Sequence, residues 1–137
     1  MGKIKDIMHA VTRVPASISI IELASLMKDK NIGSVLVESN GAIVGILTER
    51  DILVKLVAKG LDPRRIPASD LMSTVRITID AESDIVEASK LLREHPCRRL
   101  PVTRSGQIIG IVTARDIAKS LPIEIHSLMS PRIARDY

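Results

Sequence analysis

Three polar residues recur in this chain at the same spacing in two places. GILTERDI occupies residues 45–52 and GIVTARDI occupies residues 110–117, so each copy has a threonine, then an arginine two residues later, then an aspartate. A carboxylate accepts hydrogen bonds from ribose hydroxyls, and a threonine hydroxyl can bond a phosphate or a sugar oxygen. A helix that begins here after a glycine would also turn its free backbone N–H groups toward a phosphate. These residue types therefore suit a phosphorylated sugar.

The same spacing also has a purely structural explanation. Thr48 stands where a strand is expected to end and a helix to begin, and Asp51 follows three residues later. This is the arrangement of a capping box, in which side chain and backbone bond each other reciprocally. Leu47 and Ile52 have the positions of a hydrophobic staple. The second copy repeats the four residues as Val112, Thr113, Asp116 and Ile117. Helix initiation alone could explain both pairs, so the motif leaves two interpretations open.

A pair of arginines distinguishes the second copy from the first. Arg98 and Arg99 open the stretch CRRLPV, and their guanidinium groups match the geometry of a phosphate. The corresponding stretch of the first copy is IGSVLV, which has Gly33 and Ser34 instead. The copies thus agree in their ribose-type residues and differ in their anion-type residues.

The similarity between the copies extends well beyond the motif. NGAIVGILTERDI at 40–52 aligns with SGQIIGIVTARDI at 105–117 without a gap, and the lead-in KDIMHAV at 5–11 matches SDLMSTV at 69–75. Each copy spans about 60 residues, too few to bury a sufficient core alone, so we expect the copies to pack on each other.

The repeats define the expected domain organisation. We expect the first repeat at 1–60, a proline-containing linker at 61–68 and the second repeat at 69–121. The tail at 122–137 resembles the lead-ins, so it is either a closing helix or the start of a further segment.

Apolar spacing predicts a helix, a strand hairpin and a second helix in each copy. Ile20, Leu23 and Met27 recur at helical spacing, SNG at 39–41 has hairpin-turn chemistry, and Gly60 suits a helix C-terminus. In the first copy we expect a helix at 20–30, strands at 33–38 and 42–47, and a helix at 48–60. In the second copy we expect a helix near 84–94, strands near 99–103 and 107–112, and a helix from 113.

Composition limits the classes of protein. Apolar residues make up 45% of the 137 residues, yet phenylalanine and tryptophan are absent and Tyr137 is the one tyrosine. We therefore expect an aliphatic core and no aromatic platform for single-stranded nucleic acid. No apolar run approaches the roughly 18 residues of a membrane span, and the charged start does not fit a signal peptide. Cys97 is the only cysteine, which we interpret as a small buried hydrophobe, and we expect a cytoplasmic protein.

No arrangement of side chains indicates catalysis or a metal site. His9, His95 and His126 are scattered without the spacing of metal ligands. The sequence has neither a nucleophile-elbow serine nor a phosphate-binding P-loop. We therefore predict a protein that is not an enzyme and has no bound metal.

The two tandem copies resemble a pair of CBS domains, the module named after cystathionine beta-synthase. The resemblance covers residues 4–121 and is based on the duplicated G-I-[LV]-T-x-R-D block, on RRLPV at 98–102 and on the lead-ins. It implies a mixed α/β (α+β) fold of two β-α-β-β-α repeats packed about a pseudo-twofold axis, a Bateman-type module. It also implies two clefts between the repeats for an adenosine-containing ligand such as AMP, ADP, ATP or S-adenosylmethionine.

The resemblance assigns six residues to each cleft. In both clefts the aspartate would bind ribose hydroxyls and the threonine would bind a phosphate or ribose oxygen. The first cleft would be formed by Thr48, Arg50, Asp51, Thr78, Arg98 and Arg99. The second would be formed by Arg13, Gly33, Ser34, Thr113, Arg115 and Asp116. The double arginine favours the first cleft for a phosphate-bearing nucleotide, and Arg13 departs from the family pattern at the place where the second copy has Thr78.

The resemblance implies a regulatory sensor with an adenosine nucleotide as its ligand and no catalytic cofactor. It also implies a disk-like homodimer joined through aliphatic helix faces, and a regulated partner protein. The alternative is a nucleic-acid-binding or purely structural dimerisation module. The formal net charge of +4 suits an anionic small molecule as well as a nucleic acid, and the lack of aromatic residues disfavours the alternative.

Overall fold

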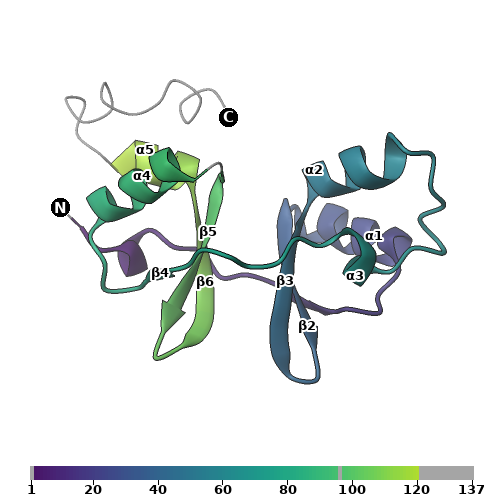
Figure 1. The fold of residues 1–137 in the computed structure, drawn as a ribbon, viewed down its shortest axis with the longest axis horizontal. Helices are drawn as coiled ribbons and strands as arrows, with labels where there is room; N and C mark the ends of the chain where they lie inside the picture. The colour runs from purple at the N-terminus through teal and green to yellow at the C-terminus, as the bar shows by residue number, and fades with distance from the viewer. Residues whose placement is uncertain (1, 96, 121–137) are drawn as a thin grey trace. The chain divides into compact units, whose positions relative to one another are not determined.

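The computed structural model describes residues 2–95 and 97–120 and divides them into two compact units (Figure 1). One consists of residues 11–76 and is called the 11–76 unit. The other combines residues 2–10 with residues 77–120 and is called the 77–120 unit. The tail predicted at 122–137, with His126 and Tyr137, lies outside the described residues.

The 11–76 unit is a three-stranded sheet with helices. Its elements in chain order are β1 Arg13–Pro15, α1 Ile20–Lys30, β2 Ser34–Ser39, β3 Ala42–Thr48, α2 Glu49–Asp51, the π-helix η2 Ile52–Val57 and α3 Ala68–Leu71. The strand order is β1-β2-β3, with β1 parallel to β2 and β2 antiparallel to β3.

The 77–120 unit repeats this arrangement. Its elements are the short 3-10 helix η1 Ile4–Asp6, β4 Ile79–Asp80, α4 Ile85–Glu94, β5 Arg99–Arg104, β6 Gln107–Thr113 and α5 Ala114–Ser120. The strand order is β4-β5-β6, with the same parallel and antiparallel pairings. The mixed α+β fold and the β-α-β-β-α order of each repeat are confirmed.

Local sequence signals account for the ends of these elements. Ser19 and Asp84 cap α1 and α4 by accepting backbone N–H bonds at 3.3 and 2.8 Å. The two hairpin turns place consecutive residues at positive φ, as in a type I′ turn. These residues are Asn40, Gly41, Ser105 and Gly106. The helix predicted at 20–30 and both predicted hairpins are confirmed.

Each unit has its own core of aliphatic side chains. In the 11–76 unit the core cluster consists of Val14, Ile20, Leu23, Met27, Val35, Val37, Leu47, Leu56, Ala68 and Leu71. In the 77–120 unit it consists of Ile4, Ile79, Ala81, Ile85, Ala88, Leu92, Leu100, Val102, Val112, Ala114 and Ile117. Helices α4 and α5 pack against each other on their sheet (Figure 1). Neither core cluster contains an aromatic side chain, as the composition predicts.

The helix predicted at 48–60 is not a single α-helix. It begins as α2 and widens into η2, where the Ala58 N–H donates to the Leu53 carbonyl, five residues back, at 2.9 Å. Three of the six residues of η2 are β-branched. Such side chains lose rotamer freedom in an α-helical turn, which weakens the α pairing here. The segment still ends at Gly60, whose φ of 69° suits a helix C-terminus.

The two lead-ins each belong to the unit that the other repeat mainly forms. The Lys5 N–H, in the first lead-in, donates to the Ala81 carbonyl at 2.9 Å. The Ser69 N–H, in the second lead-in, donates to the Ala16 carbonyl at 3.0 Å. The boundaries drawn from the repeat follow sequence similarity, whereas the compact units follow packing.

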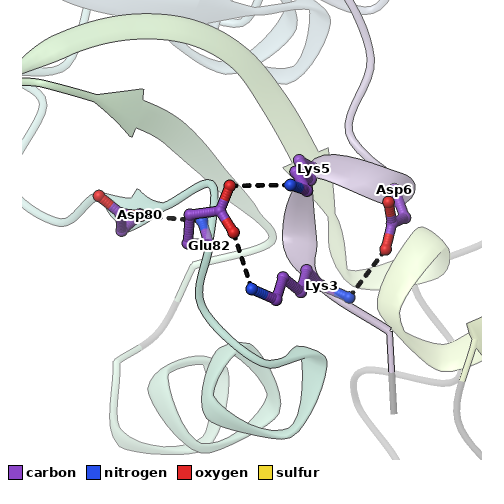
Figure 2. Close-up of polar contacts among 5 residues, drawn as sticks. All are labelled: Lys3, Lys5, Asp6, Asp80 and Glu82. Atoms are coloured by element: carbon purple, nitrogen blue, oxygen red, sulfur yellow. Dashed lines mark hydrogen bonds and ion pairs between the residues drawn. The ribbon is translucent and has the colours of Figure 1, made fainter.

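A cluster of ion pairs fastens the first lead-in to its unit (Figure 2). The Glu82 carboxylate accepts hydrogen bonds from the ammonium groups of Lys3 at 2.8 Å and Lys5 at 2.9 Å. The Glu82 N–H donates to the Asp80 carboxylate at 2.8 Å. Asp6 accepts the Lys3 N–H at 3.0 Å. The hydrogen bonds from Lys3 and then Lys5 lower the pKa of Glu82 to about 2. The cluster is exposed, so it fixes position more than it adds stability.

Candidate functional site

In the 11–76 unit, Thr48 and Asp51 form a capping box at the start of α2. The Asp51 N–H donates to the Thr48 hydroxyl oxygen at 3.2 Å. Asp51 Oδ2 accepts both the Thr48 N–H at 2.8 Å and the Thr48 hydroxyl at 3.1 Å. Leu47 and Ile52 pack in the same core, which confirms the predicted hydrophobic staple.

Thr113 and Asp116 form the same box at the start of α5 in the 77–120 unit. The Asp116 N–H donates to the Thr113 hydroxyl oxygen at 3.1 Å. Asp116 Oδ2 accepts the Thr113 N–H at 2.9 Å and the Thr113 hydroxyl at 2.8 Å. Val112 and Ile117 again pack in one core. The structural interpretation of the motif is therefore confirmed in both copies, and each box leaves Oδ1 of its aspartate for a donor outside it.

That outer oxygen has a partner that sequence reasoning missed in both units. Lys55 Nζ lies 3.2 Å from Asp51 Oδ1, and His9 Nε2 lies 2.8 Å from Asp116 Oδ1. Lys55 follows Asp51 by four residues, a helical spacing that could have indicated the pair. His9 lies on the exchanged lead-in, and no local spacing connects it to Asp116.

Asp116 gives up its proton more readily than an ordinary aspartate. Burial on its own raises the pKa of Asp116, but hydrogen bonds from His9 and from the backbone and hydroxyl of Thr113 outweigh this, so the pKa is lowered. The side chains of Asp51 and Asp116 are 17% and 19% exposed, so neither is sealed from solvent. A charged carboxylate is the stronger acceptor for a hydroxyl.

Gly33 and Ser34 lie beside the box of their own unit. Ser34 pairs with Thr48 across β2 and β3, and the first N–H of α2 donates to the Gly33 carbonyl at 3.0 Å. The resemblance assigned Gly33 and Ser34 to the cleft of Asp116, which is in the other unit. That assignment stays a prediction.

Arg98 and Arg99 have the equivalent place in the 77–120 unit. Arg99 pairs with Thr113 across β5 and β6, and the first N–H of α5 donates to the Arg98 carbonyl at 2.7 Å. The structure thus brings the double arginine close to the backbone of the Asp116 box. The resemblance grouped both arginines with Asp51, and this grouping also stays a prediction.

The four remaining predicted residues lie at the edges of these elements. Arg50 and Arg115 are exposed in the first turns of α2 and α5. Arg13 is exposed on β1, with its guanidinium 3.7 Å from the carboxylate of Glu38. Thr78 is exposed and directly precedes β4.

The glycine of the repeated motif has a packing role that sequence reasoning missed, and its suggested place before a phosphate-facing helix N-terminus stays a prediction. A Cβ atom on Gly45 would lie 2.6 Å from Met72 Sδ and 2.8 Å from the Ser73 carbonyl oxygen. A Cβ atom on Gly110 would lie 2.8 Å from the His9 carbonyl oxygen. The exchanged lead-in passes directly over each glycine, and only a residue without a side chain permits that approach.

Within residues 2–95 and 97–120, no group of three or more His, Cys, Asp or Glu side chains could hold a metal ion. None of the helices described there combines the length and apolar character needed to cross a bilayer. Cys97 packs against the core of the 77–120 unit, and burial raises the pKa of its thiol, as expected of a small hydrophobe.

Comparison with known proteins identifies the family. The family model of the CBS domain matches residues 4–58 and 68–123. The chain belongs to the CBS domain family. It is a tandem CBS domain protein, and tandem CBS domains form a family of regulatory modules.

Similar CBS proteins occur in distant organisms. CBS domain-containing protein YhcV of Bacillus subtilis is 37% identical over 119 residues, which cover 86% of this chain and 84% of that protein. Hypoxic Response Protein I, whose crystal structure contains two coordinated zinc ions, has 36% sequence identity to this chain. The two structures superpose with a TM-score of 0.73, over 88% of this chain and 100% of the Hypoxic Response Protein I chain. A hexameric CBS-CP12 protein from bloom-forming cyanobacteria is 25% identical, with a TM-score of 0.78, covering 93% and 76%. CBS proteins of this fold thus include oligomers.

Proposed function

We propose that this CBS protein is a non-catalytic regulatory module that binds an adenosine-containing ligand at its threonine–aspartate boxes. The observation that carries this proposal is the separate use of the two oxygens of each carboxylate. Oδ2 of Asp51 and of Asp116 closes a capping box, whereas Oδ1 is ion-paired with Lys55 in one copy and hydrogen-bonded to His9 in the other. A ribose offers two neighbouring hydroxyl donors, so it is chemically suited to take that oxygen.

Basic side chains near the boxes support a ligand that also has phosphate. Arg50 and Arg115 are exposed in the turn that follows each threonine, and Arg98 and Arg99 stand at the start of β5. Guanidinium groups bind phosphate in a bidentate geometry. The ligands to test first are AMP, ADP, ATP and S-adenosylmethionine. On the grouping of the double arginine with Asp51 that the family resemblance implies, we propose that the Asp51 site favours those with phosphate.

Thermal unfolding in the presence of ligands tests the proposal. We expect at least one of AMP, ADP, ATP, S-adenosylmethionine and NAD to stabilise the wild type, because a ligand at 100 times its dissociation constant adds about 2.7 kcal/mol. Asp51→Ala and Asp116→Ala should each remove the contribution of one site. Asp51→Ala should have the larger effect on nucleotides with phosphate. Unfolding temperatures with and without each ligand provide the measurement.

The control separates ligand binding from helix capping. Both substitutions also remove a capping box, so ligand-induced shifts are compared rather than absolute temperatures. Asp84→Ala removes the cap of α4, which belongs to neither box, and should lower the baseline without changing the ligand shift. A wild type that no ligand stabilises would refute the proposal, and loss of binding in Asp116→Ala alone would reverse our ranking of the sites.

The same measurement assigns the double arginine to one box. Arg99→Ala is expected to weaken binding of a phosphate-bearing ligand. If Arg99 contributes to one site only, Arg99→Ala should have no further effect in the aspartate variant that has already lost that site. Disappearance in Asp51→Ala would support the grouping predicted from the resemblance. Disappearance in Asp116→Ala would instead assign Arg99 to the box of its own unit.

We also propose that the protein forms a homodimer through an apolar helix face on η2. Leu53, Val54 and Val57 are 59%, 44% and 59% exposed. Neighbouring exposed apolar side chains indicate a contact surface. The hexameric CBS-CP12 protein gives a precedent for assembly in this fold.

Charges placed on this face should disrupt the dimer. We expect the double substitution Leu53→Asp and Val57→Asp to convert the dimer to monomer, because a carboxylate in an apolar contact is poorly solvated. Sedimentation velocity at several protein concentrations measures the change. Lys28→Asp, at a side chain that is 80% exposed on α1, is the control and should leave the sedimentation coefficient unchanged. A dimer that survives the double substitution would place the contact elsewhere.

A further inference from the structure

Lys55 is ion-paired with the outer oxygen of Asp51 and is also hydrogen-bonded to the second lead-in. Besides the contact at 3.2 Å to Asp51 Oδ1, Lys55 Nζ donates to the Leu71 carbonyl at 2.9 Å and to the Ser73 hydroxyl at 3.2 Å. Both of those acceptors belong to the second lead-in. The Lys55 ammonium thus makes two hydrogen bonds to the lead-in and one ion pair to Asp51.

In the 77–120 unit a different residue contacts the outer oxygen of the aspartate. His9 occupies the place in the first lead-in that Ser73 occupies in the second, and Ser120 occupies the place of Lys55. The Ser120 hydroxyl bonds the backbone carbonyl of Asp116 at 2.8 Å and not its side chain. The donor to Asp116 Oδ1 therefore comes from the lead-in, as the His9 ring nitrogen at 2.8 Å.

The His9 ring can leave this contact without a change of the backbone. The His9 N–H donates to the Ile111 carbonyl at 2.8 Å, and the Ile111 N–H donates to the His9 carbonyl at 3.0 Å, so the lead-in is fixed to β6. The His9 side chain, however, is 62% exposed. A side-chain rotation is then enough to expose Asp116 Oδ1.

We propose that His9 is a positioning residue of the Asp116 box: it occupies the oxygen that a ribose would use and makes ligand binding at this box dependent on pH. The inference rests on the proposed function of the boxes as adenosine sites. A protonated imidazole pairs with a carboxylate more strongly than a neutral ring does. A ligand must therefore displace a stronger partner as the pH falls. At Asp51 the competing partner is the Lys55 ammonium, so the two sites respond differently.

Charged residues on the neighbouring elements determine the choice of probe. The elements next to it carry Arg98 and Arg99 on β5, Arg115 and Lys119 on α5, and Lys5 and Asp6 on η1. A nucleotide phosphate would interact with several of these groups. Adenosine has the ribose and the base but no phosphate, so its binding reports on the competition for Asp116 alone.

The experiment measures adenosine affinity by calorimetry at pH 5.5 and pH 8, in an Asp51→Ala background that leaves one site. We expect affinity to be weaker at pH 5.5 than at pH 8 by a factor of roughly three to ten, the net range of an ordinary protein hydrogen bond. His9→Ala should bind adenosine more tightly at both values of pH and lose the dependence. His9→Gln, which keeps a donor but does not titrate, should bind less tightly than His9→Ala and should also lose the dependence.

His95→Gln is the matched control, because it removes an imidazole from the same unit and should keep the pH dependence. Adenosine binding that appears only when His9 is replaced would also support the proposal. Binding with the same affinity and pH dependence with and without His9 would overturn it while leaving the adenosine function intact. Absence of stabilisation of the wild type by every adenosine ligand would refute the function itself.

Discussion

Replacing Leu47 with alanine is expected to lower the free energy of unfolding by about 2–5 kcal/mol. Leu47 is fully buried, lies at the end of β3 and packs in the core of the 11–76 unit directly before the capping box. Truncation removes apolar contacts and leaves a cavity that the surrounding side chains fill only in part. Urea denaturation followed by circular dichroism measures the loss.

Leu61→Ala is the matched control for this truncation. Leu61 is 41% exposed, and its backbone N–H donates to the Leu56 carbonyl at 3.0 Å, a bond that alanine retains. The same chemical change should therefore cost much less at position 61. Equal losses at the two positions would show that Leu47 does not anchor the strand that leads into the Asp51 box.

Placing one methyl group at Gly45 is expected to cost about 1–3 kcal/mol. The Cβ of Gly45→Ala would meet the Ser73 carbonyl oxygen at 2.8 Å, and a backbone atom cannot yield as a flexible side chain can. The second lead-in would have to move away from β3. Thermal and urea unfolding of the variant provide the measurement.

Gly2→Ala supplies the comparison for Gly45→Ala. At Gly2 the nearest atom to an added Cβ is Ile85 Cδ1 at 3.4 Å, an ordinary van der Waals contact. We expect little loss of stability there. If Gly45→Ala were as stable as Gly2→Ala, the close approach of the lead-in to the motif glycine would not exist in solution.

The parts of the fold that depend on neighbouring residues could be predicted from the sequence. The turn at Asn40 and Gly41 needs positive φ at two consecutive positions, which asparagine and glycine tolerate. The capping bond between Thr48 and Asp51 spans three residues and forms wherever a helix starts there. Hydrophobic spacing and hydrogen-bonding chemistry are enough for such features.

The features that sequence reasoning missed depend on contacts between distant segments. The two lead-ins have similar sequences, and they bond to equivalent strands, β6 for the first and β3 for the second. Sequence similarity alone therefore does not reveal which unit a lead-in joins. His9 reaches Asp116 only because of that exchange. The packing role of Gly45 was missed for the same reason, since the segment that covers it is Met72–Ser73. The widening of the second helix into η2 was missed for a local reason, because apolar spacing alone does not distinguish an α-helix from a π-helix.

The exchange of lead-ins means that the sequence repeat and the folded unit have different boundaries. One complete unit is encoded by a continuous stretch, residues 11–76, which crosses the boundary between the repeats. The other unit is discontinuous, since it needs residues 2–10 as well as residues 77–120. A chimera that exchanged repeats at the sequence boundary would bring a foreign lead-in over each motif glycine. A graft of residues 11–76 would carry its own.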